Sequence, residues 1–82
     1  MVAKIVSLGH MRKYGDKYYC KTFLDWGINN VYISENACAD IRDLIGKEIK
    51  IDPNDGEIRT FPNESEKFLF IENIISVNGS AQ

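Results

Sequence analysis

A short polar turn between two β-favouring arms is the feature that most restricts the fold of this chain. Gly15, Asp16 and Lys17 form the turn, in the middle of the stretch Met11–Trp26. A tyrosine precedes the turn and two tyrosines follow it, a pattern typical of a β-hairpin. We therefore expect two antiparallel strands joined at Gly15.

The arm after the turn, Lys17 to Trp26, alternates between two kinds of residue. Successive side chains of a strand point to opposite faces. The set expected to line a core is Tyr18, Cys20, Thr22, Leu24 and Trp26. The set expected to point outward is Tyr19, Lys21, Phe23 and Asp25. The outward set combines aromatic rings with a cation, which is unusual for a face that only contacts water, and it is the first candidate for a binding surface.

The length and composition predict one folded domain. Eighty-two residues form a single domain over 1–82 with one compact core, and we expect 78–82 to be a flexible tail. The shares of apolar residues (44%) and charged residues (27%) are those of a globular chain. No apolar run approaches the ~20 residues of a membrane span, and the N-terminus lacks a signal-peptide pattern. These features predict a cytoplasmic protein without membrane contact.

No motif for catalysis, metals or cofactors is recognisable. Cys20 and Cys38 lack metal-ligand spacing, and without an export signal we expect free thiols. The acidic turn Asp52–Glu57 does not match a calcium loop, and there is no Walker-type or dinucleotide-binding loop. His10 has no nucleophile at a readable spacing. We expect a protein that is not an enzyme and holds no metal or cofactor.

The charges are unevenly distributed along the chain, whose net charge is −2. Residues 1–21 carry five cations and one anion, whereas residues 22–46 carry one cation and four anions. Residues 47–82 carry four cations and seven anions. This pattern predicts one cationic surface on an acidic body, although chance clustering on a solvated hairpin produces the same pattern. The acidic total argues against tight, salt-resistant binding of nucleic acid.

Other segments predict several strands. The first strand begins at Val2 and is expected to be long and bent at Gly9, because glycine within a strand marks a bulge or bend. In the short strand Val31–Ile33 we expect Tyr32 to point outward and its neighbours inward. Later strands are predicted at Lys47–Asp52, with Ile49 and Ile51 inward, at Glu57–Phe61, and at Phe68–Val77 with a bulge near Asn73. The connections are predicted at Gly27–Asn30, Pro53–Gly56 and Pro62–Lys67.

One helix is predicted at Glu35–Ile45. Ser34 is a favourable N-cap, and Glu35 places a negative charge in the first turn. Apolar residues recur at spacings of three and four, which is the period of an amphipathic helix. Gly46 is expected to end the helix in the left-handed conformation.

The order of these elements resembles the OB-fold, a small and partly open five-stranded barrel. The run Gly15-x-Lys17-x-Tyr19, followed by Leu24-Asp25-x-Gly27, is similar to the first hairpin of many OB-type single-stranded-DNA-binding proteins. It is also similar to that of the small filamentous-phage gene V family. The predicted fold is thus all-β with one helix, a five- to six-stranded OB-fold-like barrel with the helix between its third and fourth strands. An SH3-like barrel is the alternative, which the helix fits less well.

This resemblance implies sequence-tolerant binding of single-stranded DNA or RNA on the second and third strands. Aromatic rings stack on bases and cations contact phosphates. The matching positions are Arg12, Lys13, Tyr14, Lys17, Tyr19, Lys21, Phe23 and Tyr32, with His10 and Arg59 as weaker additions. Aromatic residues on a half-buried sheet equally serve packing, and for Tyr18, Trp26, Phe68 and Phe70 we favour the core.

Two other functions remain open. The acidic body favours a protein-interaction module, such as a small phage or mobile-element inhibitor that grips an enzyme. A subunit of a larger assembly, joined through a strand edge, is the third possibility. Because a small barrel leaves strand edges open and homodimers are the commonest oligomers, we also expect a homodimer.

Overall fold

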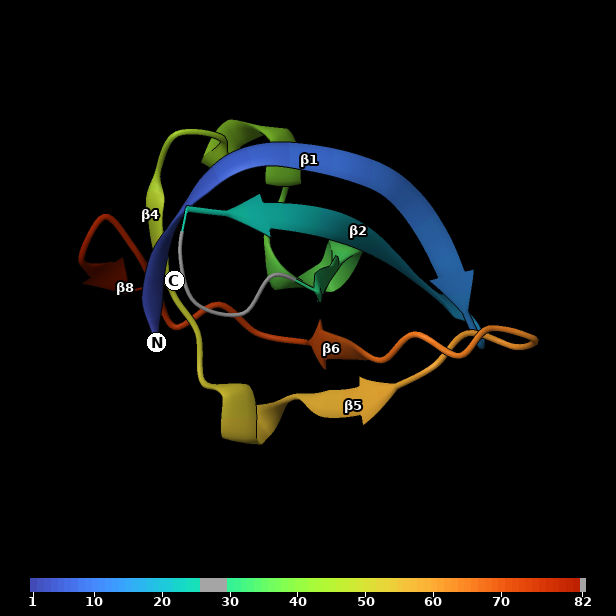
Figure 1. Cartoon of the computed structure of the whole chain (residues 1–82). Coiled ribbons are helices and arrows are strands. Elements are labelled where there is room, and N and C mark those ends of the chain that lie inside the picture. Colours follow the sequence, from blue (N-terminus) through green and yellow to red (C-terminus); the bar gives the residue numbers. More distant parts are fainter. Residues whose placement is uncertain (26–29, 82) are drawn as a thin grey trace.

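One long strand, β1 (Val2–Tyr14), joins the two halves of the sheet in the computed structural model, which describes residues 1–25 and 30–81. The other strands are β2 (Lys17–Leu24), β3 (Val31–Ser34), β4 (Glu48–Lys50), β5 (Glu57–Arg59), β6 (Phe68–Ile71), β7 (Ser76–Val77) and β8 (Ser80–Ala81). They lie in the order β5-β6-β3-β2-β1-β4-β7-β8. β1 arches over the rest of the molecule (Figure 1). The all-β prediction is confirmed.

The curvature of β1 comes from two irregularities in its pairing with β2. The register shifts once between Ile5 and Ser7 and again between Leu8 and Met11. An unpaired extra residue bends a strand and increases its twist. The second shift contains Gly9, where an added Cβ would lie 3.1 Å from the Cβ of Lys21. The long first strand with an irregularity at Gly9 was predicted, and the close approach to β2 explains why glycine is suitable there.

The predicted hairpin is also confirmed. Tyr14 pairs with Lys17, so the connection consists of Gly15 and Asp16 alone. Gly15 has a φ of +66°, which glycine adopts without strain. A glycine at the first central position of a two-residue loop is typical of a hairpin turn that matches the twist of its strands.

The sheet is open, so the predicted OB-fold-like barrel is not supported. β5 and β8 are the two ends of the strand order, and no pairing joins them in the part of the chain that the structure describes. Closure into a barrel requires strands that tilt and stagger around a common axis. Here four of the outer strands are only two or three residues long, which leaves too few ladder bonds to close the ring.

The predicted helix at Glu35–Ile45 is wrong. The segment forms two 3₁₀ turns, η1 (Glu35–Ala37) and η2 (Ile41–Leu44), and the rest of the described chain contains no α-helix. Between the turns Cys38 is extended, and the Asp40 carboxylate accepts a hydrogen bond from the Arg42 N–H at 3.0 Å. Aspartate commonly bonds to nearby backbone in this way, which competes with a continuous helix. The apolar spacing correctly placed Leu44 in the core, and Ala37, Cys38 and Ile41 pack partly buried against it, but Ile45 of the same stripe is 48% exposed.

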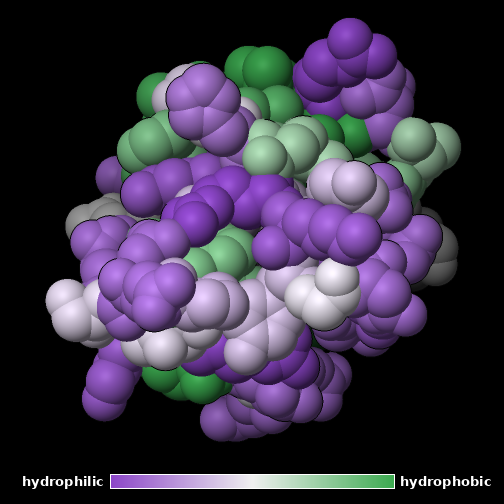
Figure 2. Space-filling model, turned by 90° about the vertical axis from the view of Figure 1, so that its right-hand side faces the viewer, coloured by the Kyte–Doolittle hydropathy of each residue, from purple (hydrophilic) through white to green (hydrophobic). Residues whose placement is uncertain are grey.

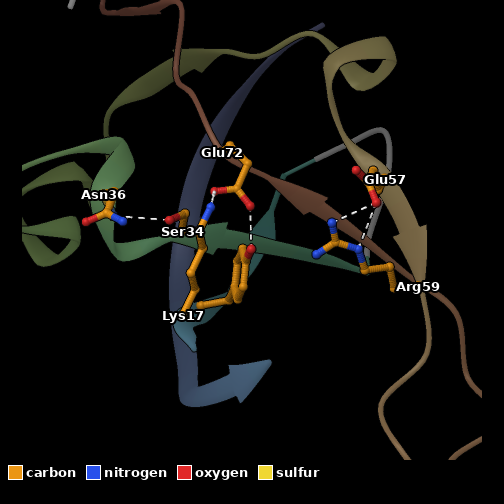
Figure 3. Close-up of polar contacts among 7 residues, drawn as sticks. Lys17, Ser34, Asn36, Glu57, Arg59 and Glu72 are labelled. Atoms are coloured by element: carbon orange, nitrogen blue, oxygen red, sulfur yellow. Dashed lines mark hydrogen bonds and ion pairs between the residues drawn. The ribbon is translucent and has the colours of Figure 1, made fainter. Parts of the chain in front are cut away.

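Ser34 and Gly46, which were predicted to cap the two ends of the helix, keep part of these predicted roles. The Ser34 hydroxyl accepts a hydrogen bond from the Asn36 N–H at 3.2 Å, so Ser34 caps η1 (Figure 3). Gly46 has the expected positive φ of +82°. Its N–H donates to the carbonyl of Ile5 at 2.7 Å, so the glycine connects the segment to β1 rather than closing a helix.

The central strands are buried on both faces. On one face Val31 and Ile33 of β3 belong to an aliphatic core that includes β6 residues Leu69 and Ile71. On the other face lies an aromatic cluster, which consists of Tyr19, Tyr32, Phe61, Phe68 and Phe70, with Tyr14 packed against it. β3 and β6 pair in parallel, and parallel strands are typically covered on both sides. The sheet therefore separates two cores of different chemistry.

The aromatic cluster corrects the expected orientation of three tyrosines. Tyr19 and Tyr32, predicted to face outward, have exposed fractions of 1% and 3%. Tyr18, predicted to face inward, is 44% exposed. The alternation itself holds, and Cys20, Thr22 and Leu24 are buried as predicted. The difference arises because Phe61 and the β6 rings Phe68 and Phe70 pack on the face of the sheet that carries Tyr19, while the aliphatic core does not reach Tyr18 near the hairpin end.

The later segments follow the prediction in outline. Ile49 and Ile51 are buried as expected, and Pro53–Asp55 forms a third 3₁₀ turn, η3, within the predicted connection. The predicted last strand is interrupted between β6 and β7, around Asn73. Ser80–Ala81, in the predicted tail, pairs with β7. Trp26 and most of the predicted turn Gly27–Asn30 lie outside the described residues.

The difference in burial between Phe70 and Phe23 predicts different losses of stability when either ring is removed. Phe70→Ala should lower the free energy of unfolding by about 3–5 kcal/mol, because it leaves a cavity in the aromatic cluster. Phe23→Ala is the matched control and should cost far less, since that ring is 42% exposed. Urea unfolding of both variants measures the difference, and equal losses would contradict the assignment of Phe70 to a core.

Candidate nucleic-acid interface

Arg12 on β1 packs against the aromatic cluster. Its Cζ is 3.5 Å from the ring centroid of Phe61, within the range of a cation–π contact. Its two terminal nitrogens donate to the two carboxylate oxygens of Glu64 in the loop before β6. This pairing raises the pKa of Arg12 and lowers the pKa of Glu64. The side chains of Arg12 and Glu64 are 36% and 38% exposed, so part of this ion pair is accessible to solvent.

Arg59 on β5 occupies a second position over the same cluster. Its Cζ is 5.1 Å from the ring centroid of Tyr14 and 5.4 Å from that of Phe70. Its Nε and Nη2 donate to Glu57 at 3.0 and 2.7 Å (Figure 3), which raises the pKa of Arg59. A shallow hollow of about 530 Å³ adjoins it, lined by Tyr14, Ile58, Arg59, Thr60 and Lys67. The hollow thus combines one aromatic wall with two cations.

Lys21 on β2 is the third cation over aromatic rings. Its Nζ is 5.2 Å from the ring centroid of Phe68 and 5.4 Å from that of Phe23. Phe68 is buried, whereas Phe23 keeps an accessible ring face. Lys21 and Phe23 therefore form a solvent-facing pair at the border of the aromatic cluster.

Glu72 contacts two of the predicted residues, Lys17 and Tyr19; Figure 3 labels Glu72 and Lys17. The Tyr19 hydroxyl donates to one carboxylate oxygen, and the Lys17 Nζ lies 3.6 Å from the other. Burial, together with the bond to Glu72, raises the pKa of Tyr19. Tyr19 is therefore a structural residue, because its ring packs in the aromatic cluster and its hydroxyl is hydrogen-bonded to Glu72.

The eight predicted binding residues do not form one surface. Tyr19 and Tyr32 are buried, so neither ring can stack on a base in this structure. Lys13 and Tyr18 form a cation–π pair at 5.9 Å on the opposite face of the hairpin from Phe23. The predicted residues that meet over the aromatic cluster are Arg12, Tyr14, Lys21 and Phe23.

Arg59 was a minor candidate in the sequence, and Lys67 was not identified at all. Both reach the site because β5 pairs with β6, which lies next to β3. A short strand was predicted at Glu57–Phe61, but no local signal showed which strand it would join. We call the combined surface of Arg12, Tyr14, Lys21, Phe23, Arg59 and Lys67 the cationic face.

The described residues give little support for a metal site, a reactive thiol or a membrane-spanning helix. No group of three or more His, Cys, Asp or Glu side chains among them could hold a metal ion. Cys20 and Cys38 are free thiols, as predicted, and burial raises the pKa of each. No helix in the part of the chain that is described is long and apolar enough to cross a membrane.

No family model, curated protein or solved structure matches this chain. The resemblance to OB-fold proteins thus stays a prediction from the pattern of elements. The function has to be argued from the cationic face itself.

The environment of Tyr19 predicts a loss of stability at high pH. Because the folded-state pKa lies above the unfolded value of about 10, the protonated phenol favours the fold. This contribution is complete below about pH 10 and is lost as the pH rises through the folded-state pKa. Tyr19→Phe should cost about 1.5–3 kcal/mol at neutral pH, the scale of a hydrogen bond to a charged group.

Urea unfolding of the wild type and Tyr19→Phe from pH 7 to pH 11 tests this expectation. The variant should show a smaller further loss above pH 10, while the exposed control Tyr18→Phe should behave as the wild type. A Tyr19→Phe variant with unchanged stability at neutral pH would show that the bond to Glu72 is not stabilising.

Proposed function

We propose that this protein binds single-stranded nucleic acid on the cationic face, with little preference for sequence. The observation that supports this proposal is the position of Arg12. The Cζ atom of its guanidinium lies 3.5 Å from the Phe61 ring centroid, and its side chain is 36% exposed. Bases stack on guanidinium planes as well as on aromatic rings. A base stacked on Arg12 would lie on the side of the guanidinium away from Phe61 and would extend this stack by one ring.

The other members of the cationic face supply the remaining contacts. Phe23 offers an exposed ring beside Lys21, which suits a second base and its phosphate. The hollow at Tyr14 has Arg59 and Lys67 on its walls, and cations in such a position contact phosphate oxygens. None of these contacts reads a particular base edge, so the proposed binding is sequence-tolerant.

Carboxylates limit the affinity of this face. Glu64 and Glu57 already pair with Arg12 and Arg59, and a phosphate would have to displace them. Exposed ion pairs of this kind contribute little stability, so displacement is feasible. The net charge of −2 also lowers the affinity of the protein for negatively charged nucleic acid. We therefore expect modest affinity that falls steeply with salt.

Fluorescence anisotropy with labelled oligo(dT), at low and moderate salt, tests the proposal. Phe23→Ala and Arg12→Ala should each weaken binding by about 1–3 kcal/mol, the scale of one stacked base. Lys21→Ala should reduce the slope of log affinity against log salt by about 0.7, the value for one phosphate contact on a single strand. Lys50→Ala on β4, outside the cationic face, is the control and should have no effect.

Removing the competing carboxylate should have the opposite effect. Glu64→Gln should strengthen binding to oligo(dT), because Arg12 then no longer has an anionic partner. Glu48→Gln changes the net charge equally but lies on β4, so it separates the local effect from the global one. If the two variants bind equally, or if the wild type does not bind at low salt, the proposal is wrong. The basic hairpin would then be a docking surface for an acidic protein partner.

A further inference from the structure

An apolar groove of about 760 Å³ lies between β1 and the segment that carries η1 and η2. Its walls include Val6 and Met11 from β1 and Ile45 from the residue after η2, with exposed fractions of 56%, 47% and 48%. Figure 2, which views the molecule from the right-hand side of Figure 1, shows hydrophobic residues gathered along its upper edge, at the height of β1. Adjacent apolar side chains of this size are typical of an interaction site.

The groove adjoins a strand edge that has no partner in the described structure. β2 pairs with one edge of β1 over Ile5–Tyr14, and β4 pairs with the other edge only over Val2–Lys4. At Ile5 the backbone still bonds to Gly46 and Lys47. Beyond that point, residues 6–13 meet no further strand on this side among the residues described. Such an edge is a template for pairing with another chain.

We propose that the chain forms a homodimer in which β1 of a second copy pairs antiparallel with this edge and lies along the groove. An antiparallel edge is complementary to itself across a two-fold axis, so one contact generates the same contact in the other copy. Val6 and Met11 line the groove of each copy, and they also belong to β1, the strand that would fill the groove of the other copy. The apolar parts of the two copies therefore match.

The charges are also complementary between the strand and the opposite wall. In the second half of β1, Lys13 lies two residues after Met11 and on the same face of the strand. The groove wall carries Glu35, which has no ion-pair partner among the residues that the structure describes, and the pair of Asp40 with Arg42. A cationic β1 from a second copy would thus meet a wall with a net negative charge. An acidic partner strand would be repelled there, which favours a second copy over such a protein.

Sedimentation equilibrium of the full chain at tens of micromolar tests the proposal. The wild type should be a dimer. Val6→Asp and Met11→Asp should each raise the dimer dissociation constant about tenfold or more, because each buries an unpaired charge in the interface. Ile58→Asp is the matched control. That side chain is 64% exposed on β5, which is separated from β1 by three strands, so the change should leave the dimer unchanged.

A charge exchange keeps the test informative if an aspartate variant unfolds. Glu35→Lys alters an exposed side chain and should weaken the dimer, and Lys13→Glu in the same chain should restore it. A monomeric wild type, or a dimer that survives Val6→Asp, Met11→Asp and Glu35→Lys, overturns the proposal. None of these residues belongs to the cationic face, so monomeric variants that still bind oligo(dT) would separate this inference from the proposed function.

Discussion

The parallel pairing of β3 with β6 is the interaction on which the rest of the structure depends. It brings Val31 and Ile33 beside Leu69 and Ile71 on one face, and Tyr32 beside Phe68 and Phe70 on the other. Without it neither core is complete, because β6 contributes Leu69 and Ile71 to the aliphatic core and two of the five buried rings to the aromatic cluster. The pairing also explains why an open sheet is stable here. Short outer strands need not close a ring when the middle of the sheet is covered from both sides.

The aromatic cluster then determines which charges can act on a ligand. Rings packed edge-to-face and tilted, with centroids 4.9–5.9 Å apart, leave faces at their border over which cations settle. Arg12, Lys21 and Arg59 occupy these positions from three different strands. The same layer that stabilises the fold therefore arranges the proposed binding surface. The acidic partners Glu57 and Glu64 orient two of these cations and moderate their attraction for phosphate.

The two proposed surfaces differ in their chemistry and in the side of β1 that they use. The cationic face depends on rings and exposed cations, whereas the groove depends on aliphatic side chains and an unpaired strand edge. β1 contributes to both, since Arg12 contacts Phe61 while Val6 and Met11 line the groove. Pairing of two β1 strands would place two cationic faces in one assembly. Two linked sites on one strand of nucleic acid would raise the overall affinity above that of either site alone.

The sequence by itself determined the local features of this protein. The turn at Gly15, the irregularity at Gly9, the positive φ of Gly46 and the inward positions of Ile49 and Ile51 follow from glycine conformation and strand alternation, which act over a few residues. The tertiary structure decided whether Tyr18 or Tyr19 would be buried, because alternation assigns the two rings to opposite faces but does not say which face a later segment will cover. It also decided that residues 35–45 form two 3₁₀ turns and not the helix that their apolar spacing predicted. Asp40 accepts a competing hydrogen bond from the Arg42 backbone, and Gly46 bonds to β1. Burial and strand partners depend on contacts between distant segments, and no local pattern contains them.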